Sequence, residues 1–415
     1  MNQQRAALAF FVALLPLVGC PSHPPIVGCT DSTVCTLMAG GQCIAAPVGF
    51  DVCAYPSTEC PAGLAWSPEA GELAGQCVAS DEDAGTDAST IDARPDAANV
   101  GCAARIAFSD GATNSPEVYA ANPDGTGITN LSTNAASDSR PDWSQVGNLV
   151  AFESTRTGNA EIFTVSGNGS TPRNVTQNAA DDRRPIFSPD GTKIAFSRQA
   201  AGAPTPSLWV IGADGTNARE LSTLPVWHTT TLSWSPDSMR IAFVESRDVF
   251  TVGLSGAAPT NLCAWTSGSC DAPAWSPDGT RVAMEVFANS NSEIYTVNAA
   301  DGSNPTKITN APTAEDVRPR WSPDGTVIVF SSTRNGSFEI FKTAVPAVGE
   351  PLRLTMHDTT INDVGAVWSP DGTRLAFVRG TGSGAKLAVI AADGTNYTDF
   401  AVATNPYGPT WSQCP

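Results

Sequence analysis

Short runs of apolar residues recur at a regular spacing through the last three quarters of the chain. The clearest runs are KIAF ending at Phe196, RIAF at Phe243, RVAM at Met284, VIVF at Phe330 and RLAF at Phe377. Each run ends nine residues after an aromatic residue that precedes a serine. These aromatics are Trp143, Phe187, Trp234, Trp275, Trp321, Trp368 and Trp411, separated by 44, 47, 41, 46, 47 and 43 residues. A period near 45 residues predicts a propeller or a solenoid.

A turn-forming tetrapeptide stands between the aromatic and the apolar run. Ser-Pro-Asp-Gly is intact at 188–191, 276–279, 322–325 and 369–372, and it reads Ser-Pro-Asp-Ser at 235–238. Pro fixes φ, Asp bonds its own backbone and Gly accepts a positive φ, so this motif predicts a hairpin between antiparallel strands. A second apolar run such as EIYTV, usually a turn such as Asp301-Gly302, and a short last strand such as KITN complete the unit. Each repeat is therefore predicted to be a four-stranded propeller blade.

The two ends of the repeat array predict how the ring closes. The array opens at 105–108 with a strand of the second type, and only the last residues supply the missing strand of the first type, at Trp411. The first blade is therefore predicted to take three strands from the start of the array and one from its end. The expected fold class is all-β: residues 101–415 form a seven-bladed propeller of four-stranded antiparallel blades. Such closure leaves no free sheet edge.

At these motifs the chain resembles the TolB-type β-propeller family, whose repeats carry W-S-P-D-G followed by I-A-F. The resemblance covers roughly residues 103 to 413. The sequence departs from the motif at the two ends of the array, where Ser-Gln-Val-Gly stands at 144–147 and Ser-Gln-Cys-Pro at 412–415. The resemblance implies a β-propeller that binds partner proteins, as TolB does in the periplasm. Many family members have six blades, so the seven predicted here leave the partner of this chain open.

Charged residues recur just before the aromatics. Aspartates stand five positions before and arginines three positions before, at Asp138, Asp182, Asp316, Asp363, Arg140, Arg184 and Arg318. Because strands alternate in direction, both turn types belong to one face, and longer loops at 198–207, 287–293, 332–339 and 379–386 belong to the other. Repeat symmetry predicts a charged ring at the channel mouth on this second face. This ring either binds a protein, peptide, sugar or cation, or consists of Asp–Arg pairs that only join neighbouring blades. His228 and His357 are predicted to be solvated loop residues.

Residues 1–19 have the features of a signal peptide. Arg5 precedes an apolar run too short to span a bilayer, and Leu17-Val18-Gly19-Cys20 follows. This ending resembles the bacterial lipobox, which implies that Cys20 becomes a lipidated N-terminus anchored in a membrane leaflet. Pro21 at the next position favours the outer membrane. An ordinary secretory signal with a coincidental cysteine is the alternative.

The remaining ten cysteines suit an oxidising compartment, in which all of them can pair. Residues 20–79 are predicted to form a small disulfide-rich module that contains Cys29, Cys35, Cys43, Cys53, Cys60 and Cys77. No Cys-x-x-Cys pair occurs among them, so a zinc site is the weaker alternative and no metal is expected. Cys263 and Cys270, seven residues apart, are predicted to staple a loop between blades. Ring closure predicts a further bond between Cys102 and Cys414.

An acidic segment and the overall charge limit the choice of partners. Residues 80–100 include six acids and few large apolar side chains, which predicts a disordered linker in preference to an Ala-rich helical spacer. The whole chain carries a net charge of −18, which argues against nucleic acid as a partner.

The sequence lacks several common motifs of enzymes. It has no Gly-x-Ser-x-Gly elbow, no phosphate-binding Gly-x-x-x-x-Gly-Lys and no His-Glu-x-x-His. The sequence therefore predicts a monomeric, lipid-anchored envelope protein without catalytic activity or a cofactor, whose propeller binds or scaffolds envelope or extracellular proteins. Two alternatives stay open: a channel-based enzyme acting on a carbohydrate or peptide, and a structural surface protein without a discrete ligand.

Overall fold

The computed structural model describes residues 42–45, 51–56, 64–66, 104–111, 115–226, 231–357, 360–380, 384–400 and 406–413. The chain divides into two compact units, residues 1–100 and 101–415. In the first unit, β1 (Gln42–Ala45), β2 (Asp51–Pro56) and β3 (Leu64–Trp66) form an antiparallel sheet whose register sets Cys43 opposite Cys53. The signal peptide with Cys20, the acidic linker, and Cys29, Cys35, Cys60, Cys77, Cys102 and Cys414 lie outside the described residues.

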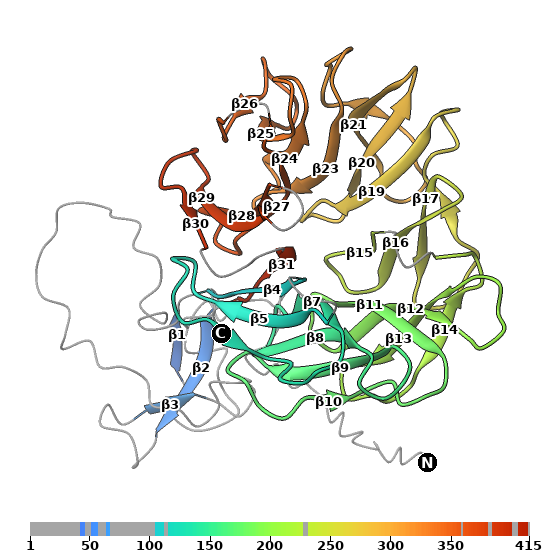
Figure 1. The fold of residues 1–415 in the computed structure, drawn as a ribbon, viewed down its shortest axis with the longest axis vertical. Helices are drawn as coiled ribbons and strands as arrows, with labels where there is room; N and C mark the ends of the chain where they lie inside the picture. Colours follow the sequence, from blue (N-terminus) through green and yellow to red (C-terminus); the bar gives the residue numbers. More distant parts are fainter. Residues whose placement is uncertain are drawn as a thin grey trace, which may run out of the picture. The chain divides into compact units, whose positions relative to one another are not determined.

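The second unit is a seven-bladed propeller, which confirms the predicted fold class (Figure 1). The first strands of the blades surround the axis, and most of them contact the first strand of the next blade. They are β31 (Pro406–Trp411), β7 (Asp138–Trp143), β11 (Asp181–Phe187), β15 (Ser233–Trp234), β19 (Ser269–Trp275), β23 (Asp316–Trp321) and β27 (Asp363–Trp368), for blades 1 to 7 in that order. The aromatic of each repeat is therefore the last residue of the innermost strand.

The outer strands follow in the same blade order. The second strands are β4 (Ile106–Asp110), β8 (Leu149–Ser154), β12 (Lys193–Gln199), β16 (Arg240–Glu245), β20 (Arg281–Ala288), β24 (Val327–Ser332) and β28 (Arg374–Arg379). The third strands are β5 (Glu117–Ala121), β9 (Glu161–Ser166), β13 (Ser207–Gly212), β17 (Asp248–Gly253), β21 (Asn291–Asn298), β25 (Glu339–Ala344) and β29 (Lys386–Ala391). The fourth strands are β6 (Thr129–Asn130), β10 (Arg173–Asn174), β14 (Arg219–Ser222), β18 (Thr260–Asn261), β22 (Thr306–Lys307), β26 (Leu352–Arg353) and β30 (Thr398–Asp399).

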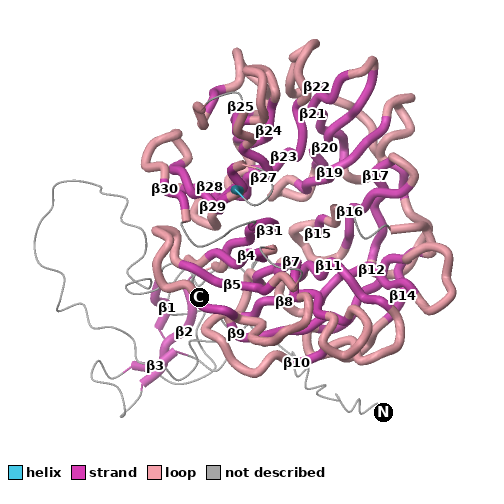
Figure 2. The backbone as a smooth tube through the Cα atoms, in the orientation of Figure 1, coloured by secondary structure: helices cyan, strands magenta, loops and turns pink. Residues whose placement is uncertain are grey.

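Figure 2 shows the propeller as strands and loops arranged around the axis. Within the described parts of the chain, no helix has the length and apolar character needed to cross a bilayer.

Blade 1 closes the ring with strands from both ends of the array, as predicted. The C-terminal β31 pairs with β4, with Trp411 opposite Ile106. Two hydrogen bonds extend this pairing: the Ser412 N–H donates to the Arg105 carbonyl at 2.8 Å, and the Arg105 N–H donates to Ser412 Oγ at 2.7 Å. The closing strand also places Trp411, 3% exposed, in a buried hydrophobic cluster that includes Phe108 of the same blade. The two ends of the propeller are thus held in one sheet.

The Ser-Pro-Asp-Gly motif forms the predicted turn. Ser188 Oγ donates to Asp190 at 2.5 Å, and the Thr192 N–H donates to the same carboxylate oxygen at 3.0 Å. Gly191 has a φ of +67°, and a Cβ there would lie 2.9 Å from Ser144 Oγ in the preceding blade. Glycine is therefore required both by the backbone conformation and by the close approach of the neighbouring turn.

The motif tryptophans hold neighbouring blades together. Their indole N–H groups donate across the blade boundary to the carbonyl of the residue before the preceding aromatic. These bonds run from Trp234 to Ile186, Trp321 to Ala274, Trp368 to Arg320 and Trp411 to Val367, at 3.1 to 3.3 Å. The core lies between blades, where the phenylalanines that end the apolar runs, such as Phe196 and Phe377, are fully buried.

One predicted loop is absent. Strands β20 and β21 extend to Ala288 and Asn291, so the expected loop at 287–293 is a two-residue hairpin. Its two turn residues, Asn289 and Ser290, have φ values of 54° and 63°. Two consecutive positive φ values are typical of the tight type I′ turn, which matches the twist of the flanking strands.

Candidate functional site

The four aspartates of the predicted rim do not lie at the channel mouth. They are all 0% exposed, and each is enclosed in its own blade by an arginine at or just after the end of the second strand. The pairs are Asp138–Arg156, Asp182–Arg198, Asp316–Arg334 and Asp363–Arg379, with shortest N···O distances of 3.1, 2.7, 2.8 and 3.9 Å. The predicted placement of the aspartates is therefore wrong, and these ion pairs do not join neighbouring blades.

The three arginines of the predicted rim lie at bulges in the innermost strands. Arg140, Arg184 and Arg318 have φ values of 55°, 56° and 55°. The pairing of their strands with the second strands shifts register at the same place. In a regular strand, residues two apart share a face, but a bulge turns the chain and sends the aspartate and the arginine in different directions. The aspartate therefore points into its blade.

The bulges also connect each blade to the one before it. The Arg184 N–H donates to Glu153 at 2.9 Å and the Arg318 N–H to Glu285 at 3.1 Å, and both glutamates lie on the second strand of a preceding blade. The Arg140 N–H donates to Ser109 at 2.9 Å in the same way. The blade-to-blade link is thus made by the backbone of the bulge.

The pKa of Arg184 reflects both its burial and its charged neighbours. Burial is the main cause that lowers this pKa to about 10, and the positive charges of Arg140 and Arg318 contribute to the same lowering. Glu153 and Asp271 oppose this shift. These residues come from blades 2, 3, 5 and 6, so their charges interact across the channel. Charged groups of both signs from these blades, with Glu285 and Arg320 among them, therefore influence one another.

A second layer of residues lines the channel nearer the Ser-Pro-Asp-Gly turns. A cavity of about 190 Å³ lies there between the innermost strands of blades 2, 3 and 4, and its lining includes Asp142, Ile186 and Ser233. One carboxylate oxygen of Asp142 accepts the Phe187 N–H at 2.7 Å, and the other accepts the Thr410 hydroxyl at 3.5 Å. Asp142 thus joins three blades, and both of its oxygens are engaged.

Asp142 is expected to make stability depend on pH. Burial raises its pKa to about 7, against the two hydrogen bonds that lower it. Because the folded state binds this proton more tightly, stability falls as pH rises from about 4 to about 7. Asp142→Asn removes the charge and keeps an acceptor for Phe187. We expect the substitution to raise the free energy of unfolding by about 1–2 kcal/mol at pH 8, since Asp142 keeps some solvent contact, and to change it little at pH 4. Urea unfolding at both pH values measures this, and an equal effect at both would contradict it.

His357 differs from its prediction. Its side chain is only 3% exposed, and Nε2 lies 2.9 Å from Asp363. The expectation of a solvated residue is therefore wrong, because in blade 7 this histidine supplements the long Arg379 contact to the buried aspartate. His228 lies outside the described residues.

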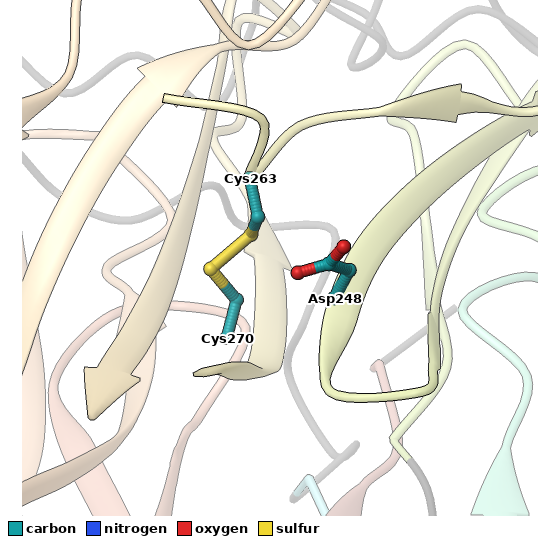
Figure 3. Close-up of side chains that lie close together, drawn as sticks. All are labelled: Asp248, Cys263 and Cys270. Atoms are coloured by element: carbon teal, nitrogen blue, oxygen red, sulfur yellow. A yellow bond between two sulfur atoms is a disulfide. The ribbon is translucent and has the colours of Figure 1, made fainter. Parts of the chain in front are cut away.

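The predicted disulfide between Cys263 and Cys270 is confirmed (Figure 3). It staples the loop between β18 of blade 4 and β19 of blade 5, and Asp248 lies beside it. These three side chains come within 4.8 Å of one another, as metal ligands do. The two sulfurs are bonded to each other, however, so neither is present as the thiolate that a metal requires.

The sequence analysis did not predict two features of the innermost strands, the arginine partners of the aspartates and the bulge. The arginines Arg156, Arg198, Arg334 and Arg379 recur 11 or 13 residues after the aromatic, a repeat signal that was available. The bulge was also signalled, because Gly365 and Gly408 occupy the same repeat position as the rim arginines, with φ values of 69° and 63°. Glycine recurring at one strand position indicates a left-handed conformation.

Comparisons with known proteins agree with this architecture. Residues 95–205 and 205–414 match the TolB beta propeller domain family. TolB from Acinetobacter baumannii is 16% identical over 74% of this chain and 66% of its own, with a TM-score of 0.48. An oligogalacturonate lyase in complex with manganese is 15% identical over 70% of this chain and 82% of its own, with a TM-score of 0.52.

A puromycin-hydrolyzing peptidase from Mycobacterium tuberculosis is 18% identical over 63% of this chain and 47% of its own, with a TM-score of 0.50. The chain thus spans about two thirds of the A. baumannii TolB chain and about half of the peptidase. At these identities the structural likeness concerns the fold alone. The family match covers most of the chain, from residue 95 to residue 414, and the chain belongs to the TolB β-propeller domain family.

Proposed function

We propose that this protein is exported, anchored by a lipid on Cys20 and bound to other envelope or extracellular proteins through the long-loop face of its propeller, without catalysing a reaction. The observation that carries the proposal is that Arg140, Arg184 and Arg318 stand at equivalent bulges of the innermost strands, where Arg140 and Arg184 share Glu153. Charged side chains at the end of a rigid channel suit a binding site, because the ring of blades fixes their positions. Membership of a family that includes TolB supports protein partners.

A crosslinking experiment tests the binding face. A photo-crosslinking residue replaces Glu315, an exposed residue next to the innermost strand of blade 6 on the long-loop side. The matched control replaces Asp301, an exposed residue in the Asp-Gly turn of blade 5 on the opposite face. Irradiation in whole cells should give discrete protein adducts at position 315 and none at 301. Adducts only at 301 would move the interface to the turn face, and adducts at neither position would reject protein binding.

The lipid anchor is tested separately. Cys20→Ser removes the thiol that would carry the lipid, so the protein should move from the detergent-extracted membrane fraction to the soluble fraction. The acyl chains of a lipoprotein bury many methylenes in the membrane, at about 0.8 kcal/mol each, so loss of the lipid should release nearly all of the protein from the membrane fraction. Cell fractionation followed by mass spectrometry of the N-terminal peptide measures it, and unchanged membrane recovery would reject the anchor.

A further inference from the structure

The cavity beside Asp142 combines apolar walls with a few polar groups. It has a volume of about 190 Å³ and lies between the innermost strands of blades 2, 3 and 4. Its apolar walls include Ile186, Leu232 and Trp234, and its polar lining residues are Asp142, Gln145 and Ser233. Asp142 is the one charged residue of the lining that the structure describes. A mostly apolar cavity with a few polar groups is typical of a site for a small ligand.

Two of the polar lining residues depart from the repeat. At the position of Asp142, just before the aromatic, the other blades have Ile186, Ser233, Ala274, Arg320, Val367 and Thr410. At the position of Gln145, five other blades have the proline of Ser-Pro-Asp-Gly or Ser-Pro-Asp-Ser, and blade 1 has Gln413. The turn therefore does not require glutamine in blade 2. Within the described ranges, the side-chain amide of Gln145 has no hydrogen-bond partner.

The carboxylate of Asp142 has acceptor capacity left for a ligand. Its two hydrogen bonds come from the uncharged Phe187 N–H and Thr410 hydroxyl. A carboxylate offers about four lone-pair sites, so about two remain. Burial raises the pKa of Asp142 to about 7, which shows that the ionised form is unfavourable without a counter-charge.

The charged residues around the cavity do not neutralise Asp142. Among the residues that the structure describes, no cation forms an ion pair with it. Arg320 holds the same position in blade 6, but the charges that act on it are those of other residues. Asp190, next to a lining proline, has its own cation in Lys193 at 3.1 Å. A cation that entered the cavity would therefore supply the charge that Asp142 lacks.

The lining suits an organic ammonium better than a metal ion. Calcium takes about six to eight oxygen ligands, whereas this lining offers one carboxylate, one amide and one hydroxyl. Asp142 is also not part of the described group of side chains that lie close enough to share a metal ion. A primary ammonium needs only three acceptors, and its carbon skeleton can contact the apolar walls.

We propose that this cavity binds a small organic ammonium ion through the carboxylate of Asp142. Gln145 and Ser233 provide further acceptors, and the carbon skeleton of the ligand packs against Ile186 and Leu232. The site lies nearer the Ser-Pro-Asp-Gly turns than the channel mouth does. It is therefore independent of the protein-binding face in the proposed function.

Calorimetric titration at pH 8 tests the site on the full chain carrying Cys20→Ser. The probes are methylammonium, butylammonium and benzylammonium, and 1-butanol is the uncharged match for butylammonium. At least one ammonium should bind with a stoichiometry of one, and butanol should bind at least tenfold more weakly than butylammonium.

Variants assign the binding to the cavity. Asp142→Asn should weaken the best ammonium at least tenfold without lowering the unfolding midpoint, because the amide keeps an acceptor for Phe187. Gln145→Ala should weaken binding at least threefold, since it removes one acceptor. The control Asp301→Asn removes the same charge as Asp142→Asn from an exposed turn in blade 5, and it should change affinity less than twofold.

Several results would overturn the inference. They are the absence of saturable binding for every ammonium, equal affinities of butanol and butylammonium, and unchanged affinity in Asp142→Asn. Calcium that binds more tightly than every ammonium and requires Asp142 would assign the site to a metal instead. The crosslinks at position 315 depend on none of these results, so this inference can fail while the proposed function stands.

Discussion

Ending the chain after residue 405 should destabilise the propeller by more than about 5 kcal/mol and abolish its cooperative unfolding. The deletion removes β31, which pairs with β4 and contributes Trp411 to a buried hydrophobic cluster. Loss of a buried Trp alone costs about 3–5 kcal/mol, and the deletion also leaves the edge of β4 that faced β31 without a partner strand. Urea unfolding followed by circular dichroism and the elution volume on gel filtration measure the effect, and the exposed edge should promote association.

A point substitution provides the control for this deletion. Trp411→Phe keeps an aromatic ring in the core but removes the indole N–H that donates to Val367 at 3.1 Å, together with the second ring of the indole. It should cost about 2 kcal/mol, clearly less than the deletion, and preserve a single transition. A truncated chain that stays monomeric with the parent unfolding midpoint would show that the ring does not depend on its C-terminal strand.

Arg198→Ala should destabilise the protein by about 3–5 kcal/mol. The Arg198 guanidinium donates two hydrogen bonds of 2.7 Å to Asp182, which is 0% exposed, and it stacks 4.2 Å from the ring centre of Trp209. Removing the arginine leaves a buried carboxylate without its counter-charge and exposes aromatic surface. Thermal and urea unfolding measure the loss of stability.

Neighbouring substitutions separate the buried charge from the loss of packing. Arg183→Ala removes a partly exposed arginine whose nearest carboxylates lie at 3.7 and 3.8 Å, and it should cost less than about 1 kcal/mol. Adding Asp182→Asn to Arg198→Ala removes the stranded charge and should restore part of the lost stability. If Arg198→Ala and Arg183→Ala cost the same, the buried ion pair does not stabilise the blade.

The repeat made the propeller predictable. Ser-Pro-Asp-Gly fixes a turn through its own hydrogen bonds, and its place after an aromatic residue sets the register of the first two strands. The array starts with three strands, β4 to β6, that lack a first strand, and it ends with the single Trp411 strand, so only one closure is possible. These features are local or periodic, so the sequence was enough to predict them.

The placement of the rim residues was less predictable because it depends on a bulge. Asp182 and Arg184 are two residues apart, a spacing that in a regular strand gives one shared face. An arginine in the sequence does not indicate a positive φ. The bulge was indicated only by the glycines at the same position of other repeats, Gly365 and Gly408. The partners of the aspartates lie 16 or 18 positions away, on the adjacent strand or just after its end, so the pairing depends on how the two strands are aligned in space.

Because blade 1 joins the two ends of the propeller, a chain that starts at a different blade could form the same ring. Arg105 and Ser412 are hydrogen-bonded to each other, so a short peptide from residue 413 to residue 104 would make the propeller circular. A new opening in the segment 223–232, between β14 and β15, would then give a circular permutant with every blade drawn from one continuous stretch. In such a molecule the array would begin with the first strand of blade 4 and need no sheet shared between its two ends, so the permutant would report how much of the folding barrier comes from bringing distant ends together.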